Sequence, residues 1–243
     1  MIIYGINPVM EALRAGKVDS LRISSRGDAR LNNVVDAAKK AGVGITRVEA
    51  GELDRASHGG VHQGVVALVA DQESLSPEDL VHGAAGAPLI VVLDSVEDPH
   101  NVGAILRTVD AAGASGVVRQ ERHAAPLGGA TAKASAGAVS HVKIADVVNI
   151  ARALEELKEA GVWTVGLAGD AEKRYDEIDY TLPTALVVGA EGAGLRRLVR
   201  ERCDWLVAIP MQGHVQSLNV SVATGVVLFE AVRQRLTRKR SST

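Results

Sequence analysis

The sequence is poor in aromatic side chains and in cysteine. Phe, Trp and Tyr together make up 2% of the 243 residues, so an RNA-binding sheet that stacks bases on aromatic rings has almost no material here. The one cysteine, Cys203, can form no internal disulfide and lacks Cys or His partners at zinc-ligand spacing. These absences indicate a reducing compartment and no structural metal.

Long apolar runs are missing as well. No stretch approaches the roughly 20 apolar residues of a membrane-spanning helix, and the N-terminus lacks the basic, apolar and small-residue regions of a secretory signal. We therefore expect a cytoplasmic protein that does not enter a membrane. The formal net charge of −2 gives no overall basic signature of nucleic-acid binding, although residues 1–70 carry nine Lys and Arg against seven Asp and Glu.

Two folded segments are predicted, separated by a stretch that is first acidic and then rich in Gly, Ala and Pro. Residues 1–71 alternate short strands with two helices and form a small α/β domain, and residues 72–88 are the predicted linker. In residues 89–243, buried strands alternate with helices, which is typical of a parallel sheet covered on both faces. The strands predicted there are 89–93, 116–118, 162–166, 186–189 and 206–209, and the helices are 102–112, 149–160 and 218–236.

Most sequence motifs of nucleotide and metal chemistry are absent. There is no P-loop lysine motif and no G-x-S-x-G elbow, and Gly189, Gly192 and Gly194 form G-x-x-G-x-G, the wrong order for dinucleotide binding. His58 and His62 stand four positions apart, but the glycines between them and the missing Glu argue against a helical zinc site. We predict no bound metal, and neither nucleotide hydrolysis nor NAD chemistry.

Polar residues do gather directly after several of the predicted strands. The first such segment, residues 98–107, runs from a polar turn into a helix that carries Asn101 and Arg107. Taken alone, it has a simple structural interpretation, in which Asn101 caps the helix and Arg107 forms a surface ion pair with Asp110. A binding or catalytic role for the two side chains is the alternative.

Two later segments have the same character. Residues 187–195 pass from a buried strand into a glycine-rich loop, where Glu191 is either a solvated acid or a carboxylate that binds an amine or an arginine. Residues 209–221 end a strand in a Pro-Gly loop, where Ser217 is either a helix N-cap or a site residue. Because ligand sites in open α/β sheets lie outside the carboxyl ends of the strands, one pocket could hold all three segments.

These segments resemble a known family. The stretches NVGAILRTVDAAG, VVGAEGAGL and IPMQGHVQSLNVSVATG closely resemble the three motifs of the SpoU (TrmH) branch of the SPOUT RNA 2′-O-ribose methyltransferases. The N-terminal YGINPVMEAL and VHQGVVA are similar to the small substrate-binding domain of the RlmB-type 23S rRNA guanosine methyltransferases. The resemblance covers essentially the whole chain.

The resemblance implies a fold, a cofactor and an assembly. Residues 89–243 would form a trefoil-knot domain that binds the methyl donor S-adenosyl-L-methionine without a metal, and residues 1–71 an L30e-like α/β domain that binds rRNA. The family dimerises, so the apolar face of the C-terminal helix, with Val222, Val226 and Phe229, is expected to form a homodimer interface. The expected cofactor contacts are Gly189, Gly192, Ile209, Met211 and Leu218.

The resemblance also implies the reaction, methylation of the ribose 2′-hydroxyl of a guanosine in the peptidyl-transferase P loop of 23S rRNA. Arg107 would lie beside that hydroxyl. Because a guanidinium has no free lone pair, Arg107 would either take the proton with the help of an RNA phosphate or stabilise the developing alkoxide.

Supporting roles follow for the remaining motif residues. Asn101 and Asn219 would position Arg107 or the ribose, Ser217 would hold the loop or the substrate, and Glu191 would fix the arginine or the charged end of the cofactor. Contacts with RNA away from the reacting ribose are expected in the N-terminal domain, where they would add affinity with little sequence information. They are Arg22, Arg26, Arg30, His62 and Gln63.

Two alternatives stay open. The same chemistry could act on another rRNA site or on a tRNA, although simple tRNA ribose methylases of this fold often lack the small N-terminal domain. A non-catalytic RNA-binding ribosome-assembly factor that kept the fold would bind RNA without methyl transfer. Against this reading, a chain that had lost catalysis would have no physical reason to keep Asn101, Arg107, Glu191 and Asn219 together.

Overall fold

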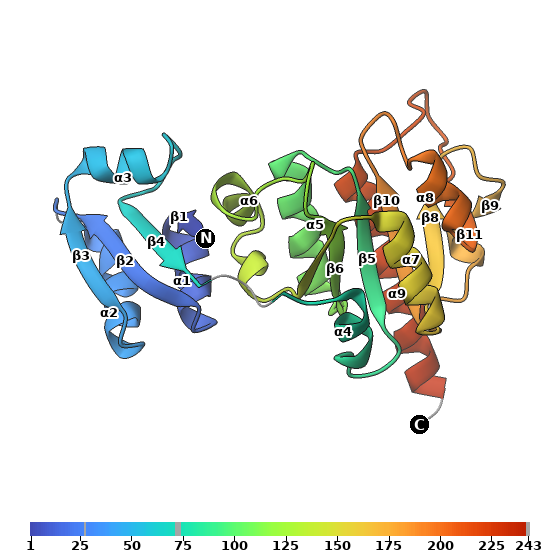
Figure 1. The fold of residues 1–243 in the computed structure, drawn as a ribbon, viewed down its shortest axis with the longest axis horizontal. Coiled ribbons are helices and arrows are strands. Elements are labelled where there is room, and N and C mark those ends of the chain that lie inside the picture. The colour runs from blue at the N-terminus through green and yellow to red at the C-terminus, as the bar shows by residue number, and fades with distance from the viewer. Residues whose placement is uncertain (27, 71–73, 242–243) are drawn as a thin grey trace. The chain divides into compact units, whose positions relative to one another are not determined.

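The computed structural model describes residues 1–26, 28–70 and 74–241, whose contacts divide the chain into two compact units (Figure 1). Unit 1 comprises Met1–Glu73, Val102–Arg107 and Ala125–His141, and unit 2 comprises the rest. The expected domain boundary at residues 71–73, like residues 242–243, lies outside the described residues, so the division into 1–71, 72–88 and 89–243 stays a prediction. Of the helices described, none is both long and apolar enough to cross a membrane.

A four-stranded mixed sheet forms the centre of unit 1, in the order β1-β4-β2-β3. β2 and β3 are parallel, whereas β4 runs antiparallel to both β1 and β2. Along β2, the buried Leu21 and Ile23 flank the exposed Arg22, the alternation expected of a sheet strand. The elements are β1 (Ile2–Tyr4), α1 (Ile6–Arg14), β2 (Val18–Ser24), η1 (Ala29–Leu31), α2 (Asn32–Lys40), β3 (Gly44–Val48), α3 (Ala50–Ala56), β4 (Val65–Val69), α6 (Gly129–Ala134) and η2 (Ala138–Ser140).

Helix α1 begins earlier than its sequence signals indicate. Asn7 followed by Pro8 predicts an N-cap at residue 7, but the helix begins at Ile6 after Gly5, whose φ of 94° favours glycine. The first backbone N–H, that of Ile6, donates instead to Oε1 of Gln63 at 2.9 Å. A side chain 57 positions along the chain thus provides the cap, which no local pattern could predict.

A seven-stranded sheet forms the centre of unit 2, in the order β7-β6-β5-β10-β8-β11-β9, with every neighbouring pair parallel. Its central strand β10 is buried along its whole length, as expected for a strand covered on both faces. The elements are α4 (Pro77–His82), β5 (Leu89–Asp94), α5 (Pro99–Ala111, of which Val102–Arg107 is counted with unit 1), β6 (Gly116–Gln120), β7 (Ile144–Val147), α7 (Ile150–Glu159), β8 (Trp163–Leu167), β9 (Lys173–Arg174), η3 (Tyr175–Glu177), β10 (Thr184–Gly189), α8 (Arg197–Arg202), β11 (Trp205–Ala208) and α9 (Val220–Ser241).

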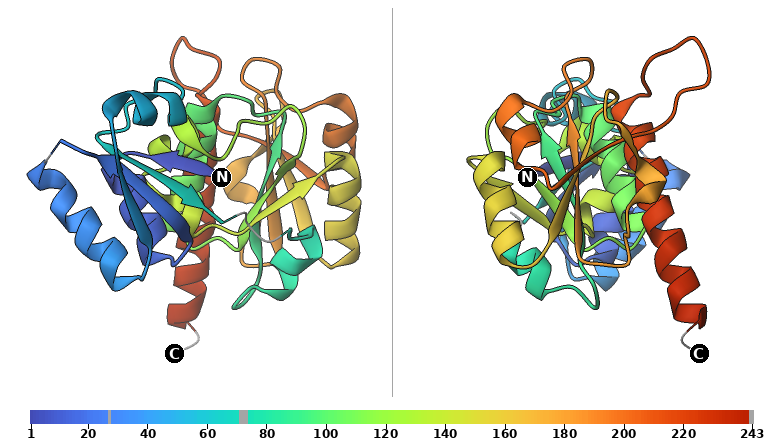
Figure 2. Two further views of the ribbon diagram at one scale, coloured as in Figure 1. Left: turned by 60° about the vertical axis from the view of Figure 1, so that its left-hand side comes forward. Right: turned by 90° about the vertical axis from the view of Figure 1, so that its right-hand side faces the viewer.

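Helices cover both faces of this sheet. Figure 2 shows α7 and α9 on opposite sides of the strands. On the α7 side, Leu154 and Leu157 pack with Ile90, Val92 and other buried residues in one apolar cluster. The prediction of a parallel sheet with helices on both faces is therefore confirmed.

Helix α4 falls inside the predicted linker. Ser76 accepts a hydrogen bond from the backbone N–H of Asp79, whose carboxylate accepts from the backbone N–H of Ser76, so the pair forms a capping box. Leu80 is fully buried in the same apolar cluster as Ile90. These residues therefore form part of the packed unit 2, although their composition suggests a loop.

Candidate active site

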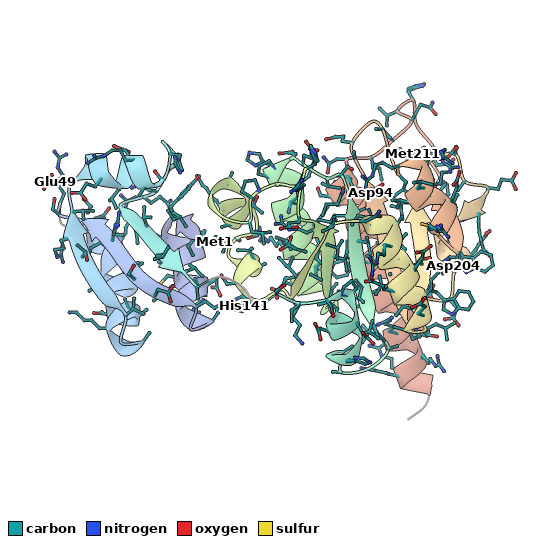
Figure 3. The ribbon with its side chains drawn as sticks, viewed as in Figure 1. Met1, Glu49, Asp94, His141, Asp204 and Met211 are labelled. Atoms are coloured by element: carbon teal, nitrogen blue, oxygen red, sulfur yellow. The ribbon has the colours of Figure 1, made fainter. Side chains whose placement is uncertain are left out.

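A cavity of about 400 Å³ opens at the carboxyl edge of the sheet in unit 2, between the loops that follow β8, β10 and β11 and the start of α9. This is where ligands bind in open α/β sheets, and the volume lies within the roughly 300–1,000 Å³ of small-molecule sites. Figure 3 shows Asp94 and Met211 at this end of the sheet. Lining the cavity are all the predicted cofactor residues and three of the predicted catalytic ones, Gly189, Gly192, Ile209, Met211, Leu218, Glu191, Ser217 and Asn219.

The floor of the cavity requires glycine. A Cβ atom on Gly189 would lie 2.1 Å from the carbonyl carbon of Gly194, a distance that no real structure tolerates. The loop folds back so closely because the N–H of Gly194 donates to the carbonyl oxygen of Ala190 at 2.8 Å. Gly192, at the tip of this turn, has a φ of 79°, which disfavours residues with a side chain. The tight turn leaves backbone atoms exposed to a ligand.

Three side chains, one on α5 and two in the loops after β10 and β11, form a hydrogen-bonded network at this edge. Asn101 donates from Nδ2 to Oε2 of Glu191 at 3.2 Å and accepts at Oδ1 from Nδ2 of Asn219 at 2.8 Å. Nδ2 of Asn219 also lies 3.5 Å from the other carboxylate oxygen of Glu191. Asn101 is 6% exposed, so its amide is buried with partners for both its donor and its acceptor. The network joins the segments after β5, β10 and β11.

Asn219 also ends the loop that follows β11. Its Oδ1 accepts from the backbone N–H of Ser221 at 2.9 Å and from the Ser221 hydroxyl at 2.6 Å, so Asn219 is the N-cap of α9. The N-cap interpretation of Ser217 is therefore wrong. Ser217 lies in the loop and lines the cavity, and α9 begins at Val220 because Asn219 offers the cap.

Arg107 lies on α5 apart from this network. Six positions along a helix separate Arg107 from Asn101, about 9 Å along the axis and about 120° around it, so the two side chains leave the helix in different directions. Arg107 is exposed, and within the described ranges no carboxylate lies at ion-pair distance, so the predicted pair with Asp110 does not form. The interpretation of Asn101 as the helix cap is also wrong, because Asp98 caps α5 by accepting from the N–H of His100.

Asp94 and Arg196 form a second link between loops, which the sequence analysis missed. Asp94 ends β5 and is fully buried, and it accepts from Nε of Arg196 at 2.6 Å and from the backbone N–H of Arg196 at 2.8 Å. Such a buried carboxylate is stable only when a cation or several donors satisfy it. A single acid at the end of an apolar strand was the one available signal, and its partner lies 102 positions away.

The predicted RNA-binding residues all lie in unit 1. A hollow of about 640 Å³ is lined by Arg26, Arg30, His62 and Gln63 together with their neighbours. Arg22 is exposed on β2 and does not line it. Arg30 is held by Asp28, which accepts from both its backbone and its guanidinium and has a pKa below its usual value for that reason. The structure thus places four of the five predicted RNA-binding residues around one hollow.

Two of these four residues have structural duties. Nδ1 of His62 accepts from the backbone N–H of Gly64 at 3.0 Å, so the neutral ring carries its proton on Nε2, 3.1 Å from Oδ1 of Asp54. Oε1 of Gln63 caps α1, which leaves its Nε2 as the group able to contact RNA. Hydrogen bonds of their side chains therefore hold the loop of residues 57–64 in place.

Thiol chemistry has no place near the cavity. Burial raises the pKa of the Cys203 thiol to about 12, and its Sγ donates to the carbonyl oxygen of Val199 at 3.3 Å. The thiol therefore stays protonated and is neither a nucleophile nor a ready metal ligand. In residues 1–26, 28–70 and 74–241, no three His, Cys, Asp or Glu side chains gather where they could hold a metal ion.

Comparison with known proteins gives two family matches. Residues 88–229 match the model of the SpoU rRNA Methylase family, and residues 2–75 match that of RNA 2′-O ribose methyltransferase substrate binding. The chain is 45% identical over 244 residues to the 23S rRNA (guanosine-2′-O-)-methyltransferase RlmB of Pseudomonas syringae pv. tomato, a match that covers 98% of this chain and 97% of the relative.

Solved structures agree. The SpoU methyltransferase AviRb from Streptomyces viridochromogenes, solved in complex with the cofactor AdoMet, has a TM-score of 0.81 at 25% identity and covers 98% of this chain and 91% of its own. The AdoMet-bound rRNA methyltransferase from Sinorhizobium meliloti has a TM-score of 0.79 at 30% identity, over 96% of this chain and 86% of its own. The resemblance seen in the three motifs is confirmed, and the chain belongs to the SpoU rRNA methylase family.

Proposed function

We propose that this protein transfers a methyl group from S-adenosyl-L-methionine to the ribose 2′-hydroxyl of a guanosine in 23S rRNA. One observation carries the proposal: the three family motifs meet at the carboxyl edge of the sheet, where the glycine-floored cavity adjoins the Asn101–Glu191–Asn219 network. The 45% identity to a 23S rRNA guanosine methyltransferase over nearly the whole chain supports the substrate class. The peptidyl-transferase P loop is our proposed site in that RNA, and the cytoplasm our proposed compartment.

The cavity fits the cofactor in size and chemistry. Apolar side chains, Leu167, Val188, Ile209 and Leu218 among them, line it beside open glycine backbone, which suits a flat adenine ring and its ribose. The Glu191 carboxylate also lines it and could face the amine or the sulfonium of the donor. When bound, S-adenosyl-L-methionine would supply its sulfonium methyl group, so that the ribose O–CH3 bond forms as the S–CH3 bond breaks and a thioether is left. The hydroxyl proton would pass to Arg107 with the help of an RNA phosphate, or to water.

Catalysis would depend on orientation and on charge stabilisation at that oxygen. Arg107 is exposed and free of ion-pair partners in the described part of the chain, so its planar guanidinium is available to an RNA phosphate and to the developing alkoxide. Asn101, Asn219 and Glu191 would hold the start of α5 and the loops after β10 and β11 together, and Ser217, which lines the cavity, would contact the loop or the substrate.

Substrate binding would extend to the N-terminal domain, residues 1–71, where Arg26 and Arg30 line a hollow. Further contacts with RNA would come from Arg22, His62 and Gln63. Phosphate contacts of this kind raise affinity and make it depend on salt. We propose that this domain has an L30e-like fold, that residues 72–88 join it to residues 89–243, and that the cofactor loops there form a trefoil knot.

We also propose a homodimer through α9. Val222, Phe229 and Leu236 are 51%, 50% and 52% exposed and stand seven positions apart, so they form one apolar stripe along the helix, beside the half-buried Val226. Phe229→Asp should convert the dimer to monomer in sedimentation velocity, whereas the same change at the exposed Leu198 should leave the dimer intact. A monomeric unaltered protein would refute this assembly.

The reaction is tested by methyl incorporation from labelled S-adenosyl-L-methionine into unmodified 23S rRNA, with the product ribose mapped. We expect label at one guanosine 2′-oxygen, and its loss in Arg107→Ala. An Arg107→Lys protein with near-normal turnover would refute the assigned role, because lysine lacks the planar fork. Label in tRNA or at another rRNA site would change the target, and RNA binding without label would favour an assembly factor.

A further inference from the structure

A second hollow lies at the carboxyl edge of the same sheet. It has a volume of about 380 Å³ and is lined by residues from β6, from the start of α7 and from α8, with Arg196 preceding the helix. The cavity and this hollow share the loop of residues 190–196, since Gly192 and Gly194 line the first and Arg196 the second. We call it the arginine hollow. Nothing in the proposed reaction uses it so far.

The lining combines exposed apolar side chains with basic and amide groups and includes no carboxylate. Val148 is 80% exposed and Leu198 54% exposed, unusually open for aliphatic side chains that share one depression. Arg196, Arg197 and Gln120 stand around them. A nucleotide has the matching chemistry, a flat apolar face on its base and an anionic phosphate.

Arg196 is held ready for such a ligand. Its Nε and one terminal nitrogen lie 2.6 Å from the same oxygen of Asp94, a carboxylate that is fully buried, while the arginine side chain remains 48% exposed. A guanidinium has five N–H donors, so an edge of the fork stays open after this clamp forms. Asp94 is thus a positioning residue that immobilises the cation and reduces the entropy lost on binding phosphate.

We propose that the arginine hollow binds one nucleotide flanking the methylated ribose. Arg196 and Arg197 contact its phosphate, and Val148 and Leu198 contact its base. The inference rests on the proposed function, because it assigns the hollow to the same RNA strand. Arg197 is 77% exposed and forms an ion pair with Glu201, which is 53% exposed. Such surface pairs are weak enough for a phosphate to replace the carboxylate.

The chain offers a matched control for this site. Arg202 lies on α8 like Arg197, is 52% exposed and also pairs with one surface carboxylate, Glu155, but it does not line the hollow. Arg197→Ala and Arg202→Ala therefore remove the same charge from the same helix. Leu198→Ser tests the apolar part without a change in charge.

The experiment measures binding of an unmodified 23S rRNA fragment that contains the target guanosine, over a series of salt concentrations. Cofactor affinity is measured in parallel. For Arg197→Ala we expect about a tenfold weaker Kd and a salt slope smaller by about 0.7–0.9, as for the loss of one phosphate contact. Leu198→Ser should weaken binding without changing the slope, and Arg202→Ala should do neither. Cofactor affinity should stay constant in all three.

Neutral methylphosphonate groups placed one at a time along the RNA identify the partner phosphate. One position next to the target should weaken binding to the unaltered protein and have no further effect on Arg197→Ala. If the unaltered protein methylates RNA but Arg197→Ala and Arg202→Ala bind alike, the nucleotide subsite is refuted and the reaction stands. If the unaltered protein methylates no RNA, the proposed function fails and this inference fails with it.

Discussion

Replacement of Asn101 by aspartate tests whether the network that joins the start of α5 to the loops after β10 and β11 stabilises the site. The substitution keeps the shape of the side chain and the acceptor for Asn219, but it turns the donor that faces Glu191 into a second carboxylate oxygen. At the 3.2 Å that now separates the two groups, like charges repel by about 1.3 kcal/mol at the dielectric constant of water and by about 5 kcal/mol at an effective value of 20. Because Glu191 is exposed, we expect roughly 2 kcal/mol.

The effect should depend on pH, and its sign follows from linkage. Repulsion and burial both favour the neutral form of the introduced carboxyl, so its folded-state pKa rises above the unfolded value of about 3.9. A raised folded pKa means that stability is kept below the unfolded value and lost as pH rises through the folded one. Asn101→Asp should therefore be about as stable as the unaltered protein near pH 4 and less stable than it at about pH 6 to 7.

Denaturant unfolding at a series of pH values measures this difference, and titration with S-adenosyl-L-methionine shows whether the cavity is affected too. Asn149→Asp is the charge-matched control, since Asn149 is the N-cap of α7, a position that accepts aspartate. Adding Glu191→Gln to Asn101→Asp should restore stability, because an amide at 191 can donate to the introduced carboxylate. An equal loss at pH 4 and pH 7, or no rescue by the second change, would refute the reasoning.

Three further results are expected. Gly189→Ala should lower the free energy of unfolding by about 1–3 kcal/mol and abolish measurable cofactor binding in calorimetry, because the added Cβ meets Gly194. In the control Gly213→Ala the added Cβ meets nothing within 4 Å, so cofactor binding should stay normal. Tight cofactor binding by Gly189→Ala would contradict this reasoning. Arg235 donates to the carbonyl oxygens of Ala87, Pro88, Tyr180 and Leu182. Arg235→Ala should therefore lower the free energy of unfolding by roughly 3 kcal/mol, and Arg235→Lys should restore less than half of that loss. Full restoration by lysine would overturn this expectation. Burial disfavours the charged form of Asp204, but the ion pair with Lys158 and the hydrogen bonds from Thr164 outweigh burial and lower the pKa of Asp204. Asp204→Asn should therefore be less stable than the unaltered protein at pH 7, and this difference in stability should vanish as pH falls below about 4. A difference that stays constant in acid unfolding would argue against a stabilising role of the Asp204–Lys158 pair.

The pattern of apolar residues predicted those strands and helices that are long enough for their burial to repeat along the sequence. Continuous apolar runs predicted β5 and β10. The short helix α3 and strand β7 were not predicted, because each is only a few residues long and too short for a period to show. Helix α4 was hidden by its composition, since Ser, Pro and Asp suggest a loop as readily as they start a helix.

The candidate site shows the same division between pattern and pairing. Polar residues after parallel strands correctly indicated a shared edge, and glycine content indicated a close backbone approach, as Gly189 requires. The clamp of Asp94 on Arg196 was missed because a lone acid after a strand has many explanations. The ion pair of Arg107 with Asp110 was a fair expectation from spacing, but helical proximity alone gains only a few tenths of a kcal/mol.

The pairings that the sequence left open are also the ones that bind the loops to each other. Asn219 caps α9 with its oxygen and holds Asn101 with its nitrogen, so the start of the last helix and the start of α5 are fixed by one amide. Asp94 fixes the far end of the 190–196 loop in the same way. The partners in these contacts are 118 and 102 positions apart, so each contact fixes a loop to a distant part of the chain. The cavity should therefore form as a unit with the sheet, so that loss of one clamp weakens cofactor binding and global stability together rather than loosening a single loop.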